Sequence, residues 1–333
     1  MRAELIASND AERLPRSVRR GIRLPRGVGS YGPLLVLLAL IALVGAVQRS
    51  FLSIPSFEAL AQDAAIFVLL AAGQTLVIMI GGIDLSVAAL TSFLTVLLAL
   101  WIPRAGVGML LVVLVLGAVF GAVQGFIHAK TQVPSFIVTL GAMGLWDSAG
   151  LMASNASTVP LTTSPALLNW LEGDTGGMPN NFLLGVAVCV AAWAALRWLP
   201  IGRQIRAVGN SERAAAILGV NRTVVRVAVF AASGLSAGLA ALALAAQQQS
   251  GGPTMADALL LPSIAAVVIG GTAITGGSGG LIRTVVGALI ISVLRVGMGV
   301  MNINPLYQQI AYGLLVICAI VLTVDRSKLG IVK

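Results

Sequence analysis

Charged side chains are scarce in this chain of 333 residues. They make up 10% of the sequence, whereas 58% of the residues are hydrophobic and the mean hydropathy is +0.97. Because a soluble domain carries about 25% charged residues, this composition excludes a soluble globular protein. Apolar runs of about 20 residues, the length that crosses a bilayer as a helix, recur along the sequence. We therefore expect an all-α polytopic membrane protein.

Residues that carry redox, metal or nucleotide chemistry are also few. The chain has two cysteines, both inside apolar runs, and one histidine, which excludes a disulfide framework and a Cys/His metal site. Its three lysines do not occur in the Gly-x-x-x-x-Gly-Lys-Ser/Thr pattern that binds nucleotide phosphates. We therefore expect no enzyme active site, no metal and no cofactor. Energy for any transport would come from an ion gradient or from a separate ATPase.

What the sequence does contain is a series of apolar segments that are each expected to cross the membrane. There are ten of them, at residues 32–48, 60–80, 87–102, 106–127, 135–153, 182–199, 224–246, 259–275, 284–301 and 306–324. Two of the segments end in similar sequences, VIMIGGIDLS (77–86) and VVIGGTAIT (267–275), which would suit an internal repeat. Paired Gly-Gly breaks of this kind also occur in the discontinuous helices of secondary transporters.

The distribution of basic residues predicts the orientation. With the N-terminus in the cytoplasm and each segment crossing once, 18 of the 21 Lys and Arg residues lie on the cytoplasmic side. The net charge of +9 therefore reflects membrane topology and does not indicate a nucleic-acid partner. We expect a basic cytoplasmic tail (1–31) that is no cleavable signal, a permease domain (32–325) with an external loop (154–181) and a cytoplasmic loop (200–223), and a cytoplasmic C-terminus (326–333).

The cytoplasmic loop contains a predicted helix of about two turns. Asn210 or Ser211 would cap its start, the residues ERAAAIL favour helix, and Gly219 would end it. Arginines surround this helix on both sides. Two interpretations stay open: a basic loop that binds anionic membrane lipid, and a helix on which a cytoplasmic protein docks.

A carboxylate interrupts the apolar run LVIMIGGIDLSVAAL (76–90). The two glycines let the backbone turn, and Asp84 is expected to cap the segment that follows, with Ser86 as a second possible cap. Arg295 lies deeper within a predicted span, where an arginine is costly unless it is paired. Asp84 is one possible partner for it.

Several stretches together resemble the membrane permease subunit of bacterial ABC importers for monosaccharides, the ribose, xylose and arabinose permease family. The likeness covers residues 34–325 and is carried by GQTLVIMIGGIDLSVAAL (73–90), VPSFIVTLGAMG (133–144), AVGNSERAAAILGVN (207–221), SIAAVVIGGTAITGGSGGLIRTVVGALII (263–291) and PLYQQIAYGLLVI (305–317). The chain departs from the family at Leu260–Pro262, where an acidic-Leu-Asp triplet is common, and at Asp147 and Ser148, where Arg-Gly is common.

The resemblance implies a fold like that of type II ABC importers in a bacterial inner membrane. It also implies partners: a cytoplasmic ABC ATPase, a sugar-binding protein outside, and a second permease, which is either identical or paralogous. The ATPase would dock on a coupling segment containing Gly209, Asn210, Ser211, Glu212, Arg213, Ala214, Ala215 and Gly219. Candidates for the translocation path or its gate are Gln74, Thr75, Gly81, Gly82, Asp84, Ser86, Thr139, Asn302 and Gln308. The alternative is a stand-alone secondary carrier for a small polar solute.

Overall fold

A computed structural model describes residues 28–304 and 306–323 of the chain. Of the predicted tail (1–31), residues 1–27 lie outside these residues, as does the predicted C-terminal segment 326–333, and residues 28–31 belong to the first helix. The first five helices are α1 (Val28–Val47), α2 (Ile54–Met79), α3 (Val87–Ala105), α4 (Gly108–Thr131) and α5 (Ser135–Ser154), with the 3-10 helix η1 (Arg49–Leu52) between α1 and α2. The others are α6 (Ala166–Glu172), α7 (Asn180–Trp198), α8 (Pro200–Asn210), α9 (Glu212–Ile217), α10 (Arg222–Gln248), α11 (Leu260–Ile269), α12 (Leu281–Val300) and α13 (Leu306–Thr323), with η2 (Asp257–Leu259) before α11.

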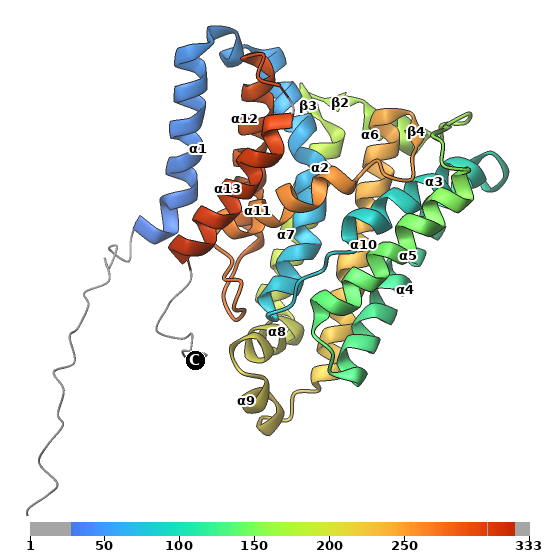
Figure 1. The fold of residues 1–333 in the computed structure, drawn as a ribbon, viewed down its shortest axis with the longest axis vertical. Coiled ribbons are helices and arrows are strands. Elements are labelled where there is room, and N and C mark those ends of the chain that lie inside the picture. Colours follow the sequence, from blue (N-terminus) through green and yellow to red (C-terminus); the bar gives the residue numbers. More distant parts are fainter. Residues whose placement is uncertain (1–27, 305, 324–333) are drawn as a thin grey trace, which may run out of the picture. The chain divides into compact units, whose positions relative to one another are not determined.

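The predicted all-α membrane architecture is confirmed (Figure 1). Each of the ten predicted apolar segments corresponds to a helix, and the described part of the chain contains seven helices long and apolar enough to cross a membrane. The eighth segment was predicted too long, because α11 ends at Ile269 rather than near residue 275. The cause is Gly271, whose φ of +85° takes the backbone out of the helix.

The two Gly-Gly breaks end their helices in the same way. After α2, the amides of Gly81 and Gly82 bond back to the carbonyls of Ile78 and Val77, at 2.9 and 3.0 Å. After α11, the amides of Gly271 and Thr272 bond back to Val268 and Val267, at 2.9 and 3.2 Å. Gly81 and Gly271 both have positive φ values, +79° and +85°. The local structure thus supports the repeat that the sequence indicated.

Helix α2 lies at the centre of the bundle and packs against α7, α10, α11 and α12. In the most apolar 18-residue stretch of α2, 83% of the residues are buried, compared with 17% in that of α5. Helix α10 also packs closely on α4, because glycines face each other there. A Cβ atom on Gly121 would lie 2.1 Å from the carbonyl oxygen of Phe230, and one on Gly234 would lie 2.0 Å from that of Gly117. Small residues at such spacing let two membrane helices approach at backbone distance.

The polar loop 154–181 contains short ordered elements. Strand β1 (Val159–Pro160) pairs antiparallel with β4 (Ser250–Gly251), which follows α10. Strands β2 (Asp174–Thr175) and β3 (Met178–Pro179) form a hairpin around Gly176 and Gly177, both with positive φ. The β1–β4 pairing connects the loop to the end of α10.

Candidate functional site

The break between α2 and α3 is held in place by side chains of α5. The amide of Ile83 donates to Ser135 Oγ at 2.9 Å, and that of Leu85 donates to Thr139 Oγ1 at 3.0 Å. Thr139 Oγ1 in turn donates to the carbonyl of Ser135 at 3.0 Å or to that of Ile83 at 3.3 Å. Buried backbone amides outside a helix need such partners. The chain between α2 and α3 is therefore extended and is held at two of its backbone amides by α5.

Asp84 occupies the middle of a buried polar network and is only 3% exposed. Its Oδ1 accepts from the amide and the hydroxyl of Ser86, at 3.0 and 2.7 Å, and its Oδ2 accepts from Ser233 Oγ of α10 at 2.8 Å. The Gln74 amide of α2 donates to the Asp84 carbonyl. Gln124 Oε1 of α4 lies 2.8 Å from Ser86 Oγ. Asp84 thus joins α2, α3 and α10, and Ser86 connects α4 to the same network.

The network agrees with the expectation that Asp84 supports the start of α3, since its carboxylate binds the backbone amide of the N-cap residue, Ser86. The alternative cap was wrong, because the Ser86 side chain makes no capping bond and instead contacts Asp84 and Gln124. A hydroxyl carries one proton, so Ser86 donates to only one of these two at a time.

A second feature joins the break to the loop before α12 and to α8. Four glycines form it, and we call them the glycine junction: Gly81, Gly209, Gly276 and Gly277. The amide of Gly277 donates to the carbonyl of Met79, the last residue of α2, at 2.9 Å. A Cβ on Gly276 would lie 2.8 Å from the amide nitrogen of Gly81 and 3.0 Å from the carbonyl oxygen of Gly209. Three backbone segments therefore touch without intervening side chains.

Gly209 is the most tightly enclosed member of the junction. A Cβ there would lie 2.0 Å from the Met79 carbonyl oxygen and 2.5 Å from the Gly277 nitrogen. A Cβ on Gly277 would lie 2.1 Å from Asn210 Oδ1. Since real Cβ atoms do not approach other atoms this closely, Gly209 accepts no side chain without movement of the backbone, and a side chain at Gly277 would require the Asn210 side chain to move. The end of α8 is therefore in rigid contact with the end of α2.

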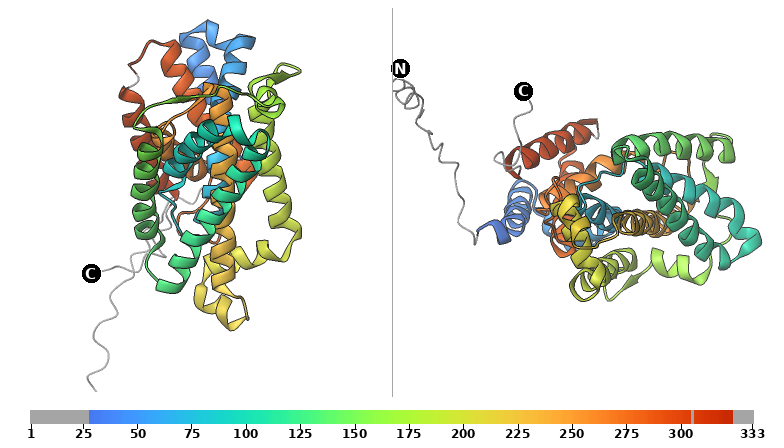
Figure 2. Two further views of the ribbon diagram at one scale, coloured as in Figure 1. Left: turned by 90° about the vertical axis from the view of Figure 1, so that its right-hand side faces the viewer. Right: turned by 90° about the horizontal axis from the view of Figure 1, so that it is seen from below.

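The loop after α7 forms two helices, α8 and α9, where one was predicted. Both lie at the same end of the molecule as the start of α10 (Figures 1 and 2). Ser211, the residue between them, caps α9 by accepting from the Ala214 amide at 3.3 Å, which confirms one of the two predicted caps. Gly219 ends α9 as predicted, with a φ of +78°. Its amide donates to the Ala216 carbonyl at 3.0 Å, and the Val220 amide donates to the Ala215 carbonyl at 3.0 Å.

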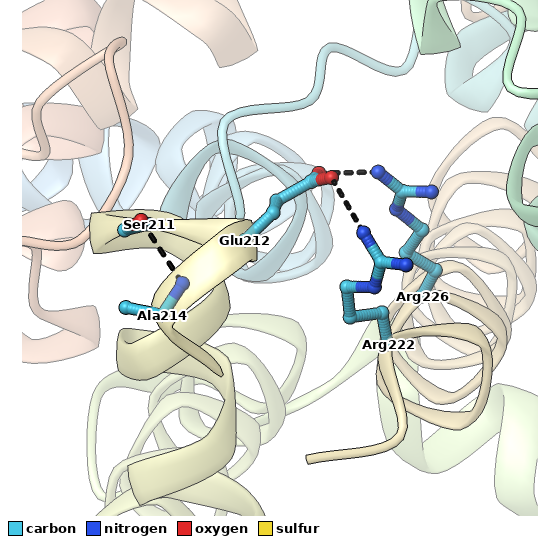
Figure 3. A network of polar contacts seen from close by, with 5 residues as sticks. All are labelled: Ser211, Glu212, Ala214, Arg222 and Arg226. Atoms are coloured by element: carbon cyan, nitrogen blue, oxygen red, sulfur yellow. Dashed lines mark hydrogen bonds and ion pairs between the residues drawn. The ribbon is translucent and has the colours of Figure 1, made fainter. Parts of the chain in front are cut away.

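Helix α9 is fixed to α10 by an ion pair (Figure 3). Glu212 Oε1 contacts Nη2 of Arg226, whose side chain is 13% exposed. Glu212 Oε2 lies 3.9 Å from Arg222 Nη1. The last residues of this segment are apolar and exposed. Ile217 is 86% exposed and Leu218 is 77% exposed.

The structure separates the remaining candidates from the break. Thr75 lies within α2 and shares a 2.8 Å hydrogen bond with Thr284 of α12. Asn302 and Gln308 lie beyond the far end of α12, about 30 Å of helix away from the glycine junction. The suggested pairing of Arg295 with Asp84 was wrong. Arg295 instead pairs with Asp63, at 3.2 Å, because Asp63 lies on the length of α2 that faces α12.

Sequence reasoning missed three members of the site: Gln124, Ser135 and Ser233. Ser135 lies in VPSFIVTLGAMG, a stretch that was singled out, but nothing local marks its hydroxyl as a partner of a break 50 residues earlier. Gln124 is a polar residue in an otherwise apolar span, which is a usable signal, since such residues form interhelical hydrogen bonds.

Comparison with known proteins identifies this architecture. A family described as "Branched-chain amino acid transport system / permease component" matches residues 56–320. The chain belongs to this permease family. The ribose import permease protein of Escherichia coli (strain K12) is 36% identical to this permease over 301 residues, covering 89% of the permease and 93% of the relative. That of Bacillus subtilis (strain 168) is 33% identical over 302 residues, covering 89% and 92%.

The fructose import permease protein of Rhizobium meliloti is 33% identical to this permease over 300 residues, covering 86% of it and 83% of the relative. No solved structure gives a significant match. The resemblance to monosaccharide importer permeases is thereby confirmed. The protein is a membrane permease subunit and not an enzyme, and ATP hydrolysis belongs to a separate subunit of the importer.

Proposed function

We propose that this permease forms the translocation path of an ATP-driven importer for a monosaccharide, which a soluble binding protein delivers from outside. Relatives of equal identity, 33%, are named for ribose and for fructose. The proposal therefore covers pentoses and hexoses as a class. A path for neutral sugars needs hydrogen-bonding groups rather than ion pairs, which agrees with the serine, threonine and glutamine side chains around the break.

The orientation proposed from the basic residues places α8 and α9 in the cytoplasm and the loop 154–181 outside. Arg203, Arg206 and Arg213 are exposed on α8 and α9, as the positive-inside rule expects for a cytoplasmic segment. With ten crossings, both termini lie in the cytoplasm. A second copy of the permease would complete the path.

The observation that carries the proposal is the contact of the coupling segment with the end of α2 and with the loop before α12. In our mechanism the ATPase docks on the apolar face of α9, at Ile217 and Leu218. The Glu212–Arg226 ion pair holds α9 on α10, so that α8 and α9 move with the ATPase. Through Gly209, α8 presses on the end of α2 and on the loop before α12. ATP-driven motion would thus reach the segment around Asp84, which would act as the gate.

Uptake into proteoliposomes tests this proposal. The permease is reconstituted with its cognate ATPase and binding protein and offered labelled ribose, xylose, arabinose, fructose, glucose and galactose. We expect uptake of at least one sugar that requires both ATP and the binding protein and that persists when an uncoupler collapses the ion gradient. Uptake by the permease alone, or uptake abolished by the uncoupler, would identify a secondary carrier instead. No uptake of any of the six sugars would refute the proposed substrate class.

A further inference from the structure

An apolar groove opens on the side of the bundle between α7, α8 and α10. It has a volume of about 270 Å³, and the nine residues that line it are all alanine, valine, leucine or isoleucine. Helix α7 contributes Ala192 and Ala195 to one wall, and α10 contributes Ala228 and Ala232 to the other. Because Ala228 is exposed, the groove is open to whatever surrounds the bundle.

The groove lies where α7 and α10 are separated. Both helices pack on α2, and they meet where Asn181 Nδ2, near the start of α7, lies 3.5 Å from the Ala243 carbonyl oxygen, near the end of α10. The groove is at the other ends of these two helices. There α8 contributes Ile201 and Ile205 to the lining, so the short helix closes the end of the groove.

The groove has the depth of one membrane leaflet. Ala192 is six residues before the end of α7 at Trp198, about 9 Å along the helix. Ala232 is ten residues after the start of α10 at Arg222, about 15 Å along that helix. Half of a hydrocarbon core of about 30 Å is about 15 Å. Trp193 and Trp198 are 40% and 73% exposed, and tryptophans collect at the level of the lipid headgroups. The groove therefore runs from the headgroups into the acyl chains.

Exposed arginines lie beside the α8 end of the groove. Arg197 directly follows Leu196, and Arg206 directly follows Ile205, and both of these apolar residues line the groove. Arg203 lies one turn before Arg206 on α8. None of the three arginines forms an ion pair within the described part of the chain. A guanidinium is well suited to bind a phosphate group, and basic residues at the membrane surface attract anionic lipids.

The chemistry of the groove selects its occupant. A sugar would need hydrogen-bonding groups, and the lining offers only aliphatic side chains. Water is also excluded, since an apolar cavity of about 150 Å³ already stays dry and takes up an apolar guest. A cytoplasmic protein would meet α8 from the membrane surface, whereas the groove extends into the hydrocarbon. An acyl chain with a negatively charged headgroup satisfies both the apolar lining and the neighbouring arginines.

We infer that this groove is a binding site for one anionic phospholipid. Its acyl chain lies between α7 and α10, and its phosphate contacts the arginines beside α8. Under the proposed orientation the lipid belongs to the inner leaflet. The inference goes beyond transport and does not depend on which sugar is carried. It gives a defined place to the lipid binding that the basic loop 200–223 suggested from its sequence.

Native mass spectrometry tests the groove. The full-length permease is purified with its ATPase in a neutral detergent and titrated with phosphatidylglycerol, or with phosphatidylcholine of the same acyl chains. We expect the wild type to retain one phosphatidylglycerol per permease and to bind it at least about fivefold more tightly than phosphatidylcholine. Ala195→Phe and Ala228→Phe fill the groove from opposite walls, and each should lose the retained lipid without a fall in Tm. Val190→Phe is the matched control, because Val190 is on α7 and 45% exposed but does not line the groove.

The arginines provide a second test that alters no packing. Arg197→Gln and Arg206→Gln should each weaken the binding of phosphatidylglycerol about fivefold at low salt, whereas Arg213→Gln, on α9, should bind it as the wild type does. Wild-type lipid affinity in the phenylalanine and arginine variants would overturn the inference, as would equal affinity of the wild type for the two lipids. Unchanged lipid binding with loss of ATPase co-purification in the phenylalanine variants would assign the groove to a protein partner and would also overturn it.

Discussion

Replacing Gly209 by alanine would test the proposed communication of the coupling segment with the end of α2 and the loop before α12. The added methyl group would lie 2.0 Å from the Met79 carbonyl oxygen and 2.5 Å from the Gly277 nitrogen. Both obstacles are backbone atoms, and together they form the 2.9 Å hydrogen bond between α2 and the loop before α12. Because no flexible side chain can move aside, the backbone segments themselves must separate.

The energetic cost has two parts. Overpacking by one methylene in a packed interior costs about 1–3 kcal/mol, and the loss of a buried hydrogen bond adds about 1 kcal/mol. The native geometry of the junction is thus destabilised by a total of about 2–4 kcal/mol. Since about 1.4 kcal/mol corresponds to a factor of ten, we expect ATP-driven uptake to fall at least about tenfold. The exposed face of α9 is not touched, so the ATPase should still co-purify with the variant.

The assay compares uptake, ATPase co-purification and membrane insertion of Gly209→Ala with those of Gly141→Ala. Gly141 lies within α5, and a Cβ added there would meet no atom within 4 Å, so its variant should behave as the wild type or gain slightly in stability. Normal uptake by Gly209→Ala would refute the idea that motion passes through the glycine junction. A variant that no longer binds the ATPase would place the defect in docking rather than in transmission.

Three further predictions follow from the geometry. Asp84→Asn should lower the stability by about 1–3 kcal/mol, because the Asp84 carboxylate accepts three buried hydrogen bonds; an unchanged Tm in detergent would contradict this. Gly121→Ala should destabilise the α4–α10 contact by a similar amount, since its methyl would lie 2.1 Å from the Phe230 carbonyl oxygen; the comparison is with Gly144→Ala, which has open space, and equal Tm values would count against the packing argument. Leu218→Asp should abolish ATPase co-purification while Tm is maintained, because Leu218 is 77% exposed; retained co-purification would exclude this face as the docking site.

Helix positions were predictable from the sequence because membrane spans are long and their signal is strong. The ten apolar runs became helices, and the ends of α9 followed from Ser211 and Gly219 as local capping rules require. The error at α11 has a local cause too. Its apolar run continues to residue 275, but Gly271 with positive φ ends the helix earlier.

The tertiary contacts could not be predicted from the sequence in the same way. Asp84 binds Ser233, 149 residues later, and Gly277 binds the end of α2 almost 200 residues earlier. Nothing in the local sequence specifies such pairs. Arg295 shows the same limit, since the sequence suggested Asp84 as its partner and the packing of α12 on α2 selects Asp63.

The proposed docking of a cytoplasmic ATPase on α9 is tested most directly by site-specific cross-linking. In a variant without Cys189 and Cys318, a single cysteine is placed at one of two positions. One is Leu218, directly after α9, and the other is Met152, near the C-terminal end of α5, which lies outside in the proposed orientation. Both positions are well exposed, at 77% and 80%. We predict that a short thiol cross-linker captures the ATPase from position 218 and not from position 152. Capture of the ATPase from position 152 alone would contradict both the proposed orientation and the proposed coupling segment.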